Sequence, residues 1–227
     1  WKEYQRRLRE ASSLLSPGER LLDLGAGAGT STLALAKSGL KCTALDWWYE
    51  YDDDNDMGTQ AEIVDRFRRF GVETVNMRFG AKDALPFADA SFDAVSFYDV
   101  IEHLHESPKQ VLSEIRRVLR PGGALLISTP NITALRTRLA LLFGRTVHFP
   151  ISVWYHDDPF CGHIREFTGP ELSWMLEQSG FERVALSYSN DAQAGTRYAD
   201  GSWSPGYTPK DRKSTRLNSS HTDISRM

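Results

Sequence analysis

The residues best suited to chemistry form a glycine-rich turn directly after a short apolar run. Asp23 lies within that run, and Gly25, Gly27 and Gly29 follow it at alternate positions. Glycines here let the backbone pass close to a ligand, and the helix expected next presents free N–H groups. The spacing differs from the G-x-G-x-x-G turn of dinucleotide dehydrogenases, because Thr30 occupies the third glycine position. The turn therefore predicts a cofactor site of another kind.

A second acid, Asp46, closes the next apolar run, KCTALD at 41–46. A carboxylate at the end of the strand beside a glycine turn can accept hydrogen bonds from both hydroxyls of a ribose. Asp46 is therefore predicted to bind the ribose of a nucleoside cofactor.

Further segments follow in a fixed order and together are specific. They are KDALPF and SFDAV at 82–95, YDVIEHL at 98–104, EIRRVLRPGGALLISTPN at 114–131 and GHIREFTGPEL at 162–172. With the glycine turn they resemble class I S-adenosylmethionine-dependent methyltransferases, in particular the branch that contains ubiquinone-biosynthesis O-methyltransferases. The resemblance covers 21–131 and continues at 162–172, and it implies S-adenosylmethionine as the cofactor.

The resemblance also implies roles for single residues of the cofactor site. Asp23 would contact the methionine end of the cofactor. Asp83 would accept the adenine amino group, with the Ala84 backbone beside it, and Tyr98 belongs to the same set. Taken alone, Asp83 is equally well explained as a turn or cap residue.

Methyl transfer from a sulfonium is an in-line displacement, so the protein mainly aligns the acceptor, helped by a base where the nucleophile is poor. His103 and His163 are the candidate catalytic bases. His103 follows the expected strand 92–97, at the sheet edge where ligands bind. The alternatives are that Glu102 caps a helix while His103 bonds locally, and that His163 ties a covering segment to the sheet.

In some ubiquinone-type relatives an acid-x-x-acid-His pattern at this place is associated with a divalent metal. The pattern here is Asp99, Glu102 and His103, and the shorter first acid reduces the reach of the set. Cys42 and Cys161 belong to no metal-ligand spacing. No structural zinc is expected and no metal is assigned, and whether Asp99, Glu102 and His103 bind a metal is left open.

The leading functional hypothesis is transfer of a methyl group to an oxygen, ahead of nitrogen or carbon, of a small-molecule or glycan- or lipid-linked acceptor. A catalytically silent binding module and a nucleotide-cofactor oxidoreductase are the alternatives. The segment after the fourth strand, Tyr98 to Ile101, lacks the Pro-Pro-aromatic run of DNA amino methyltransferases. No cysteine lies in a site segment to serve a base-directed carbon methyltransferase. Nucleic-acid acceptors are not expected.

Alternating strand and helix patterns predict an α/β fold with a doubly wound, Rossmann-like, mostly parallel sheet in three α/β/α layers. The expected strands are 21–24, 41–46, 75–79, 92–97, 124–128 and 181–187. The expected helices are 4–15, 30–38, 60–70, 108–119 and 169–179.

A long segment, 129–167, separates the fifth strand from the last helix and is rich in aromatic residues. Such insertions are usually functional or disordered. Leucines at 135, 139 and 142 indicate a short helix, so the segment is predicted to be a partly helical cover over the site. Trp154, Tyr155 and Phe160 could line an acceptor pocket or simply pack. One methyltransferase domain is expected over 1–210.

Composition adds few constraints. The net charge of −3 and the acidic run at 52–56 argue against a nucleic-acid surface. The longest apolar stretch, Leu139 to Phe143, is too short to span a bilayer, and no leader is visible. With no disulfide framework, a cytoplasmic location is expected.

The last segment, 211–227, resembles the translation of a sequencing adapter. It is expected to be a non-native disordered tail. Because 190–210 is rich in Gly and Pro, the final antiparallel strand of the fold is expected to be missing.

Overall fold

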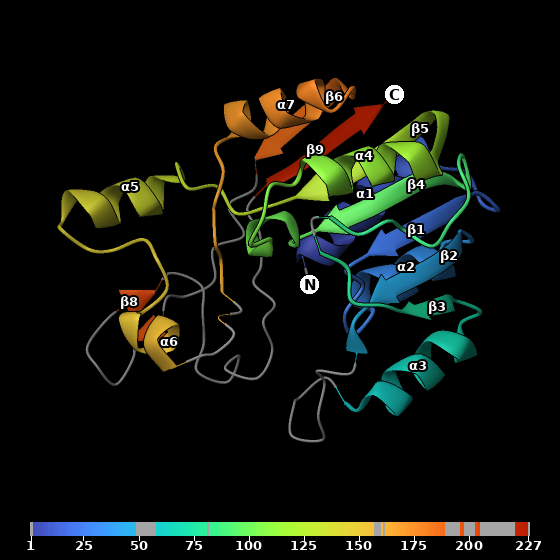
Figure 1. Ribbon diagram of the computed structural model, residues 1–227, viewed down its shortest axis with the longest axis horizontal. Helices are drawn as coiled ribbons and strands as arrows, with labels where there is room; N and C mark the ends of the chain where they lie inside the picture. The colour runs from blue at the N-terminus through green and yellow to red at the C-terminus, as the bar shows by residue number, and fades with distance from the viewer. Residues whose placement is uncertain are drawn as a thin grey trace.

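The computed structural model describes residues 2–48, 58–80, 82–156, 160, 162–188, 196–197, 203–204 and 221–226. Seven strands form one sheet in the order β3-β2-β1-β4-β5-β9-β6 (Figure 1). They are β1 (Arg20–Leu24), β2 (Lys41–Asp46), β3 (Glu73–Asn76), β4 (Phe92–Tyr98), β5 (Leu119–Ser128), β6 (Glu182–Tyr188) and β9 (His221–Arg226). Two short strands, β7 (Thr196–Arg197) and β8 (Trp203–Ser204), pair separately.

Helices connect the strands. They are α1 (Lys2–Leu14), α2 (Thr30–Lys37), α3 (Gln60–Arg69), α4 (Lys109–Val118), α5 (Leu135–Leu142), α6 (Ile151–His156) and α7 (Gly169–Gln178), with a 3-10 turn, η2 (Ile101–His103). Capping boxes start α3 at Thr59 and α7 at Thr168, in each case with a glutamate three residues on.

The sheet is mostly parallel, as predicted. β1 pairs in parallel with β2 on one side and β4 on the other, so the chain reverses its direction of growth between β1 and β4. In doubly wound sheets, ligands bind at the carboxyl ends of the strands beside such a reversal. The fold therefore predicts a ligand site at the carboxyl ends of β1, β2 and β4, which end at Leu24, Asp46 and Tyr98.

Neighbouring residues of β1 belong to two different hydrophobic clusters, one on each face of the sheet. In β1, Leu22 and Leu24 pack with α4 and α7, whereas Leu21 packs with α1, α2 and α3. Since neighbouring strand residues point to opposite faces, an unbroken apolar run is what a strand covered on both faces requires. The predicted three-layer α/β/α architecture is confirmed.

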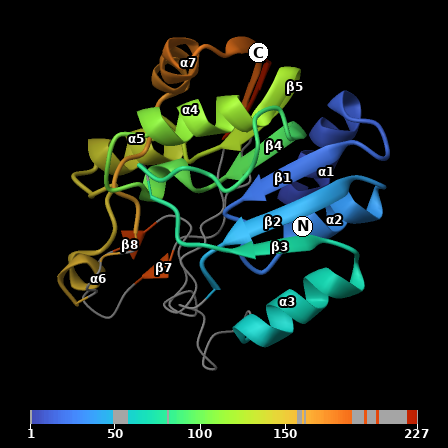
Figure 2. The same cartoon turned by 45° about the vertical axis from the view of Figure 1, so that its right-hand side comes forward.

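The covering segment is partly helical, as predicted. α5 and α6 lie beyond the carboxyl ends of the parallel strands, where α5 extends away from the sheet (Figures 1 and 2). No helix among the residues with a described structure is long and apolar enough to cross a membrane.

Two sequence-based boundaries need correction. β3 covers Glu73–Asn76 instead of 75–79, because its pairing with β2 ends where β2 ends, at Asp46 opposite Asn76. Part of the predicted tail is also in the sheet: His221–Arg226 forms β9, antiparallel to both β5 and β6.

The expectation that the sheet lacks its antiparallel strand is therefore wrong. Ladder pairing uses backbone N–H and C=O groups, which any extended segment offers, so a polar composition did not exclude a strand here. Residues 211–220 and most of 190–210 lie outside the described residues, and the adapter-like origin of the segment stays a prediction.

Candidate active site

The glycine turn runs from the end of β1 into α2 in a backbone conformation that favours glycine. Gly25, Gly27 and Gly29 have φ angles of +84°, +53° and +86°. A Cβ on Gly29 would lie 2.5 Å from the ring of Phe67, so this position also lacks room for a side chain. The turn is held to the neighbouring strand by the Gly25 N–H, which donates to the Leu45 carbonyl at 2.9 Å.

Asp46 contacts this turn directly. Its Oδ2 accepts from the Gly27 N–H at 2.5 Å, and its Oδ1 accepts from the Trp47 N–H at 2.7 Å. The Trp48 indole N–H donates to the Gly27 carbonyl at 2.8 Å. Asp46 and the glycine turn thus meet at one edge of the sheet, and the predicted binding of a ribose by Asp46 stays a prediction.

The Asp23 side chain is buried and hydrogen-bonded within the protein. It is 3% exposed and accepts hydrogen bonds from the hydroxyls of Thr32, on α2, and Ser96, on β4, the latter at 2.8 Å. Because these bonds join β1 to the helix and strand beside it, Asp23 fixes the base of the turn. Its predicted contact with the methionine end of the cofactor stays a prediction.

Asp83 and Ala84 lie exposed on the connection before β4. The Asp83 Oδ2 accepts from the Gly80 N–H at 2.6 Å, which is the turn role considered as its alternative. Among the described residues, Asp83 makes no hydrogen bond with the glycine turn. Its adenine role and that of Ala84 stay predictions.

Tyr98 ends β4 and is fully buried, which raises the pKa of its phenol. Its ring is covered by the Arg7 guanidinium, whose central carbon lies 4.4 Å from the ring centroid. Such stacking of a cation on an aromatic face is favourable. Tyr98 therefore lies at the carboxyl end of β4 with its ring packed against the Arg7 guanidinium.

Arg7 is a site residue that the sequence reasoning missed. Its guanidinium donates to Asp99 Oδ2 at 2.5 Å and to the Ser31 hydroxyl at 3.2 Å. The Ser128 hydroxyl donates to the other oxygen of Asp99 at 2.9 Å. This buried network joins α1 to the ends of β4 and β5 beside the start of α2, and Asp99 adopts a positive φ of +57° within it.

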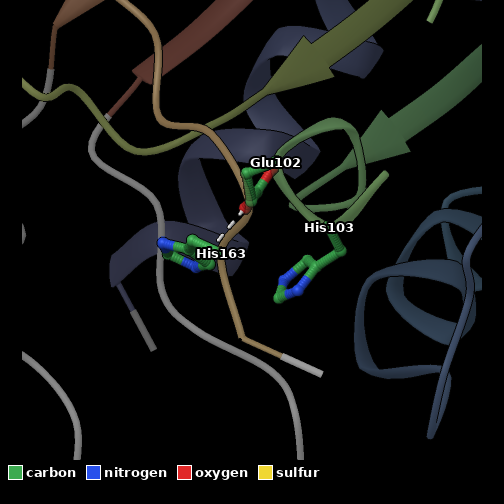
Figure 3. Close-up of side chains that lie close together, drawn as sticks. All are labelled: Glu102, His103 and His163. Atoms are coloured by element: carbon green, nitrogen blue, oxygen red, sulfur yellow. Dashed lines mark ion pairs between the residues drawn. The ribbon is translucent and has the colours of Figure 1, made fainter. Parts of the chain in front are cut away.

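The two predicted bases meet beside a buried glutamate (Figure 3). Glu102 and His103 come from η2 after β4, and His163 comes from the end of the covering segment. The imidazole centroids are 5.0 Å apart, and His163 Nε2 lies 4.0 Å from Glu102 Oε1. Glu102 also holds the segment through its carbonyl, which accepts from the Ile164 N–H at 2.8 Å.

The Nδ1 atom of each imidazole faces an oxygen acceptor. His103 Nδ1 lies 3.2 Å from the Gly162 carbonyl, and His163 Nδ1 lies 2.8 Å from Glu166 Oε1. If each Nδ1 carries the proton, the Nε2 atoms are the basic positions. In this tautomer Nε2 holds the lone pair with which a neutral imidazole accepts a proton.

Glu102 itself is completely buried. Burial raises its pKa well above the usual range, and the nearby Asp99 carboxylate raises it further, while the Thr129 hydroxyl opposes the shift. Folding therefore favours the protonated form of Glu102 relative to the unfolded chain.

Raising the pH is expected to destabilise the folded protein through Glu102, and Glu102→Gln should remove this dependence. The raised pKa means that the folded state keeps a proton that the unfolded state loses near pH 4.5. The stabilisation is complete below that unfolded value and is lost as the pH rises through the folded pKa. Thermal unfolding measured from acid to neutral pH checks this, with the exposed Glu106→Gln as control. Equal pH slopes in wild type and Glu102→Gln would contradict it.

Glu102, His103 and His163 are also residue types that can bind a metal ion. Their ligand atoms lie within 4.8 Å of one another. Asp99, the first acid of the pattern associated with metal in the resembling branch, instead pairs with Arg7 and Ser128. The described residues thus do not assemble that ligand set. The expectation of no structural zinc stays a prediction.

A cavity of about 680 Å³ lies elsewhere, lined by Asp89, Ser113 and Arg117 among others near the amino end of β5. Arg117 is held there by Glu114 and Asp89, both at 2.8 Å. This is the opposite edge of the sheet from the glycine turn, and we assign it no part in the chemistry.

Residues 1–186 match the family model described as a methyltransferase domain. The chain belongs to this methyltransferase family. A probable S-adenosylmethionine-dependent methyltransferase of Mycolicibacterium smegmatis is 36% identical over 165 residues, covering 73% of this chain and 52% of the relative. A demethylmenaquinone methyltransferase of Corynebacterium efficiens is 38% identical over 137 residues, covering 59% and 52%. The chain spans about half the length of these curated relatives.

Solved methyltransferase structures share the fold. A Burkholderia thailandensis 1,6-didemethyltoxoflavin-N1-methyltransferase, with bound 1,6-didemethyltoxoflavin and S-adenosylhomocysteine, has a TM-score of 0.59 at 19% identity, covering 99% of this chain and 77% of that one. A Methanosarcina mazei SAM-dependent methyltransferase has a TM-score of 0.58 at 18% identity, covering 96% of both chains. S-adenosylmethionine is the cofactor of this domain, as predicted.

Proposed function

We propose that this methyltransferase transfers the methyl group of S-adenosylmethionine to an oxygen, ahead of nitrogen or carbon, of a small-molecule or glycan- or lipid-linked acceptor. The observation that carries the proposal is the meeting of Gly27 and Asp46 at 2.5 Å, at the carboxyl edge of the sheet. His103 follows β4 at the same edge.

In this proposal the cofactor lies along the glycine turn. Gly25, Gly27 and Gly29 allow its close approach, and Asp46 accepts the ribose hydroxyls in place of one of its present backbone donors. Asp83 and Ala84 hold the adenine. Asp23 and Tyr98 support the methionine end from within the protein.

When bound, S-adenosylmethionine would supply its methyl carbon to the acceptor oxygen, with the electron pair of the broken carbon–sulfur bond left on the sulfur of S-adenosylhomocysteine. His103 Nε2 takes the hydroxyl proton of the acceptor. His163 is the second candidate base, and the Gly162 carbonyl beside it faces His103 Nδ1 at 3.2 Å, which links the covering segment to His103.

Two other expectations remain part of the proposal: the acceptor is not a nucleic acid, and the protein acts in the cytoplasm. Membership of the methyltransferase family argues against the oxidoreductase alternative. A silent binding module would bind cofactor without turnover. Incubation with methyl-labelled S-adenosylmethionine and a panel of phenolic, sugar and prenylated acceptors separates these readings: labelled product supports the proposal, and cofactor binding without product from any class opposes it.

Replacing Asp46 by Ala is expected to weaken S-adenosylmethionine binding by about 2–3 kcal/mol, because two hydroxyl bonds to a charged acceptor disappear together. Equilibrium dialysis with labelled cofactor measures the change. Asp89→Ala, at the opposite edge of the sheet, is the control and should bind normally. Equal affinities in the two variants would remove Asp46 from the cofactor site.

A further inference from the structure

Asp99, the residue directly after β4, has a backbone conformation that residues other than glycine seldom adopt. Its φ is +57°, in the left-handed region. A residue with a side chain is strained there and keeps the conformation only where its surroundings enforce it, which happens most often at functional sites. The reason for the conformation therefore lies in the contacts that Asp99 makes.

Strand β5 and helix α1 together hold Asp99 in place. On β5, the Ser128 carbonyl accepts from the Asp99 N–H at 2.9 Å, and the Ser128 hydroxyl donates to Asp99 Oδ1, also at 2.9 Å. On α1, Arg7 donates to Asp99 Oδ2 at 2.5 Å, and the two side chains are only 8% and 10% exposed. The same Arg7 nitrogen donates to the Ser128 hydroxyl at 3.3 Å. Charge-assisted hydrogen bonds between buried partners thus fix the Asp99 side chain.

The left-handed turn at Asp99 brings Val100 against the glycine turn. A Cβ added to Gly25 would collide with the Val100 side chain, so this valine lies directly beside the glycine. Gly25 begins the turn along which the cofactor is proposed to lie. Because Asp99 and Val100 are consecutive, a change of conformation at Asp99 would move Val100 away from the glycine turn.

The same turn sets where η2 begins. The His103 N–H donates to the Val100 carbonyl at 3.0 Å, so the 3-10 turn is built directly on residue 100. Ile101 and Glu102 are buried on this turn, and His103 stands at its end. The position of the His103 imidazole therefore depends on the direction in which the chain leaves Asp99.

We propose that Asp99 is a positioning residue of the methyl-transfer site. Its bonds to Arg7 and Ser128 fix the left-handed turn, and the turn orients both Val100 and His103. Asp99 acts through these neighbours and not by touching cofactor or acceptor. The part that concerns His103 rests on the proposed function, whereas the part that concerns Val100 needs only the cofactor.

Three replacements of Asp99 separate its side-chain bonds from its backbone conformation. Asp99→Asn keeps hydrogen-bonding groups and tolerates a positive φ, so kcat should stay close to the wild-type value. Asp99→Gly permits the turn but lacks the bonds, and Asp99→Ala lacks the bonds and also disfavours the turn. We expect kcat to fall about 100-fold in the Gly and Ala variants, because misplacement of a reacting group by about 1 Å can have an effect of this size.

Asp93, at the other end of β4, provides the matched control. It accepts from the Arg120 side chain at 2.6 Å and from the Arg20 N–H at 2.7 Å, so Asp93→Ala also removes an ion pair and a hydrogen bond from this strand. Thermal unfolding should show a loss of stability in Asp93→Ala, as in Asp99→Ala. Steady-state kinetics at a temperature where every variant is folded should show wild-type kcat in Asp93→Ala alone of these two.

Titration with S-adenosylhomocysteine tests the Val100 part without an acceptor. Asp99→Gly should bind it several-fold more weakly than wild type, and Asp99→Asn and Asp93→Ala should bind it normally. Wild-type protein that binds S-adenosylhomocysteine but methylates no acceptor would oppose the proposed function, while the order of these affinities would still support or overturn the role of Asp99.

Three results would overturn the proposal. Wild-type kcat and affinity in Asp99→Gly would mean that a permissive backbone suffices and that the side-chain bonds position nothing. Equal losses in Asp99→Asn and Asp99→Gly would assign the effect to the negative charge of Asp99 instead of its geometry. Equal losses in Asp93→Ala and Asp99→Ala would reduce the role of Asp99 to stability of the fold.

Discussion

Replacing His103 by Gln is expected to lower kcat about 100- to 10,000-fold, the usual contribution of a general base. Glutamine keeps much of the size and polarity of the side chain but cannot take a proton at the Nε2 position. Affinity for S-adenosylmethionine should stay close to the wild-type value, because the proposed cofactor contacts lie on the glycine turn and Asp46. Steady-state kinetics with an acceptor from the proposed panel measures both quantities.

The pH profile and a neighbouring histidine provide the controls. The rise of kcat with pH that deprotonation of a base produces should vanish in His103→Gln. His105→Gln should behave like wild type, since His105 is exposed and its ring faces the Phe160 carbonyl at 3.2 Å. Full activity in His103→Gln would transfer the role to His163 or leave catalysis to alignment alone.

Replacing Gly27 by Val is expected to abolish measurable cofactor binding. The residue has a φ of +53°, which disfavours a β-branched side chain, and it lies in the turn along which the cofactor must pass. We expect affinity to fall at least about 100-fold, with most of the fold kept. Quenching of tryptophan fluorescence by S-adenosylhomocysteine is a suitable readout, because the Trp48 indole donates to the Gly27 carbonyl.

Gly71→Val separates strain from the loss of binding. Gly71 has a similar φ of +66°, and a Cβ there meets nothing within 4 Å. Both variants should therefore lose stability, but Gly71→Val should bind cofactor normally. Similar binding losses in the two would mean that backbone strain, not blockage of the cofactor path, explains the effect.

The approach of the glycine turn to Asp46 could be predicted from the sequence because its signals are local. A glycine turn after one strand and an acid after the next must meet when the two strands are parallel neighbours, and Gly27 and Asp46 do so. The alternation of strand and helix patterns likewise predicted the three layers. The end of β3 was misplaced because it depends on the length of its partner β2.

Contacts between distant segments could not be read from one sequence. Arg7 looks like an ordinary polar residue of an amphipathic helix, yet it pairs with Asp99 at 2.5 Å at the ends of β4 and β5. The approach of His163 to Glu102 depends on how the covering segment folds back, which the spacing of the two residues along the chain does not encode. Strand β9 was missed for a different reason, since backbone pairing left little trace in its side chains.

Calorimetric titration of the wild-type protein with S-adenosylhomocysteine, and in parallel with NAD, tests the central claim most directly. If the glycine turn and Asp46 hold an S-adenosyl cofactor, S-adenosylhomocysteine will bind in a 1:1 ratio and NAD will give no binding heat. Binding of NAD, or the absence of binding by S-adenosylhomocysteine to folded protein, would contradict the account.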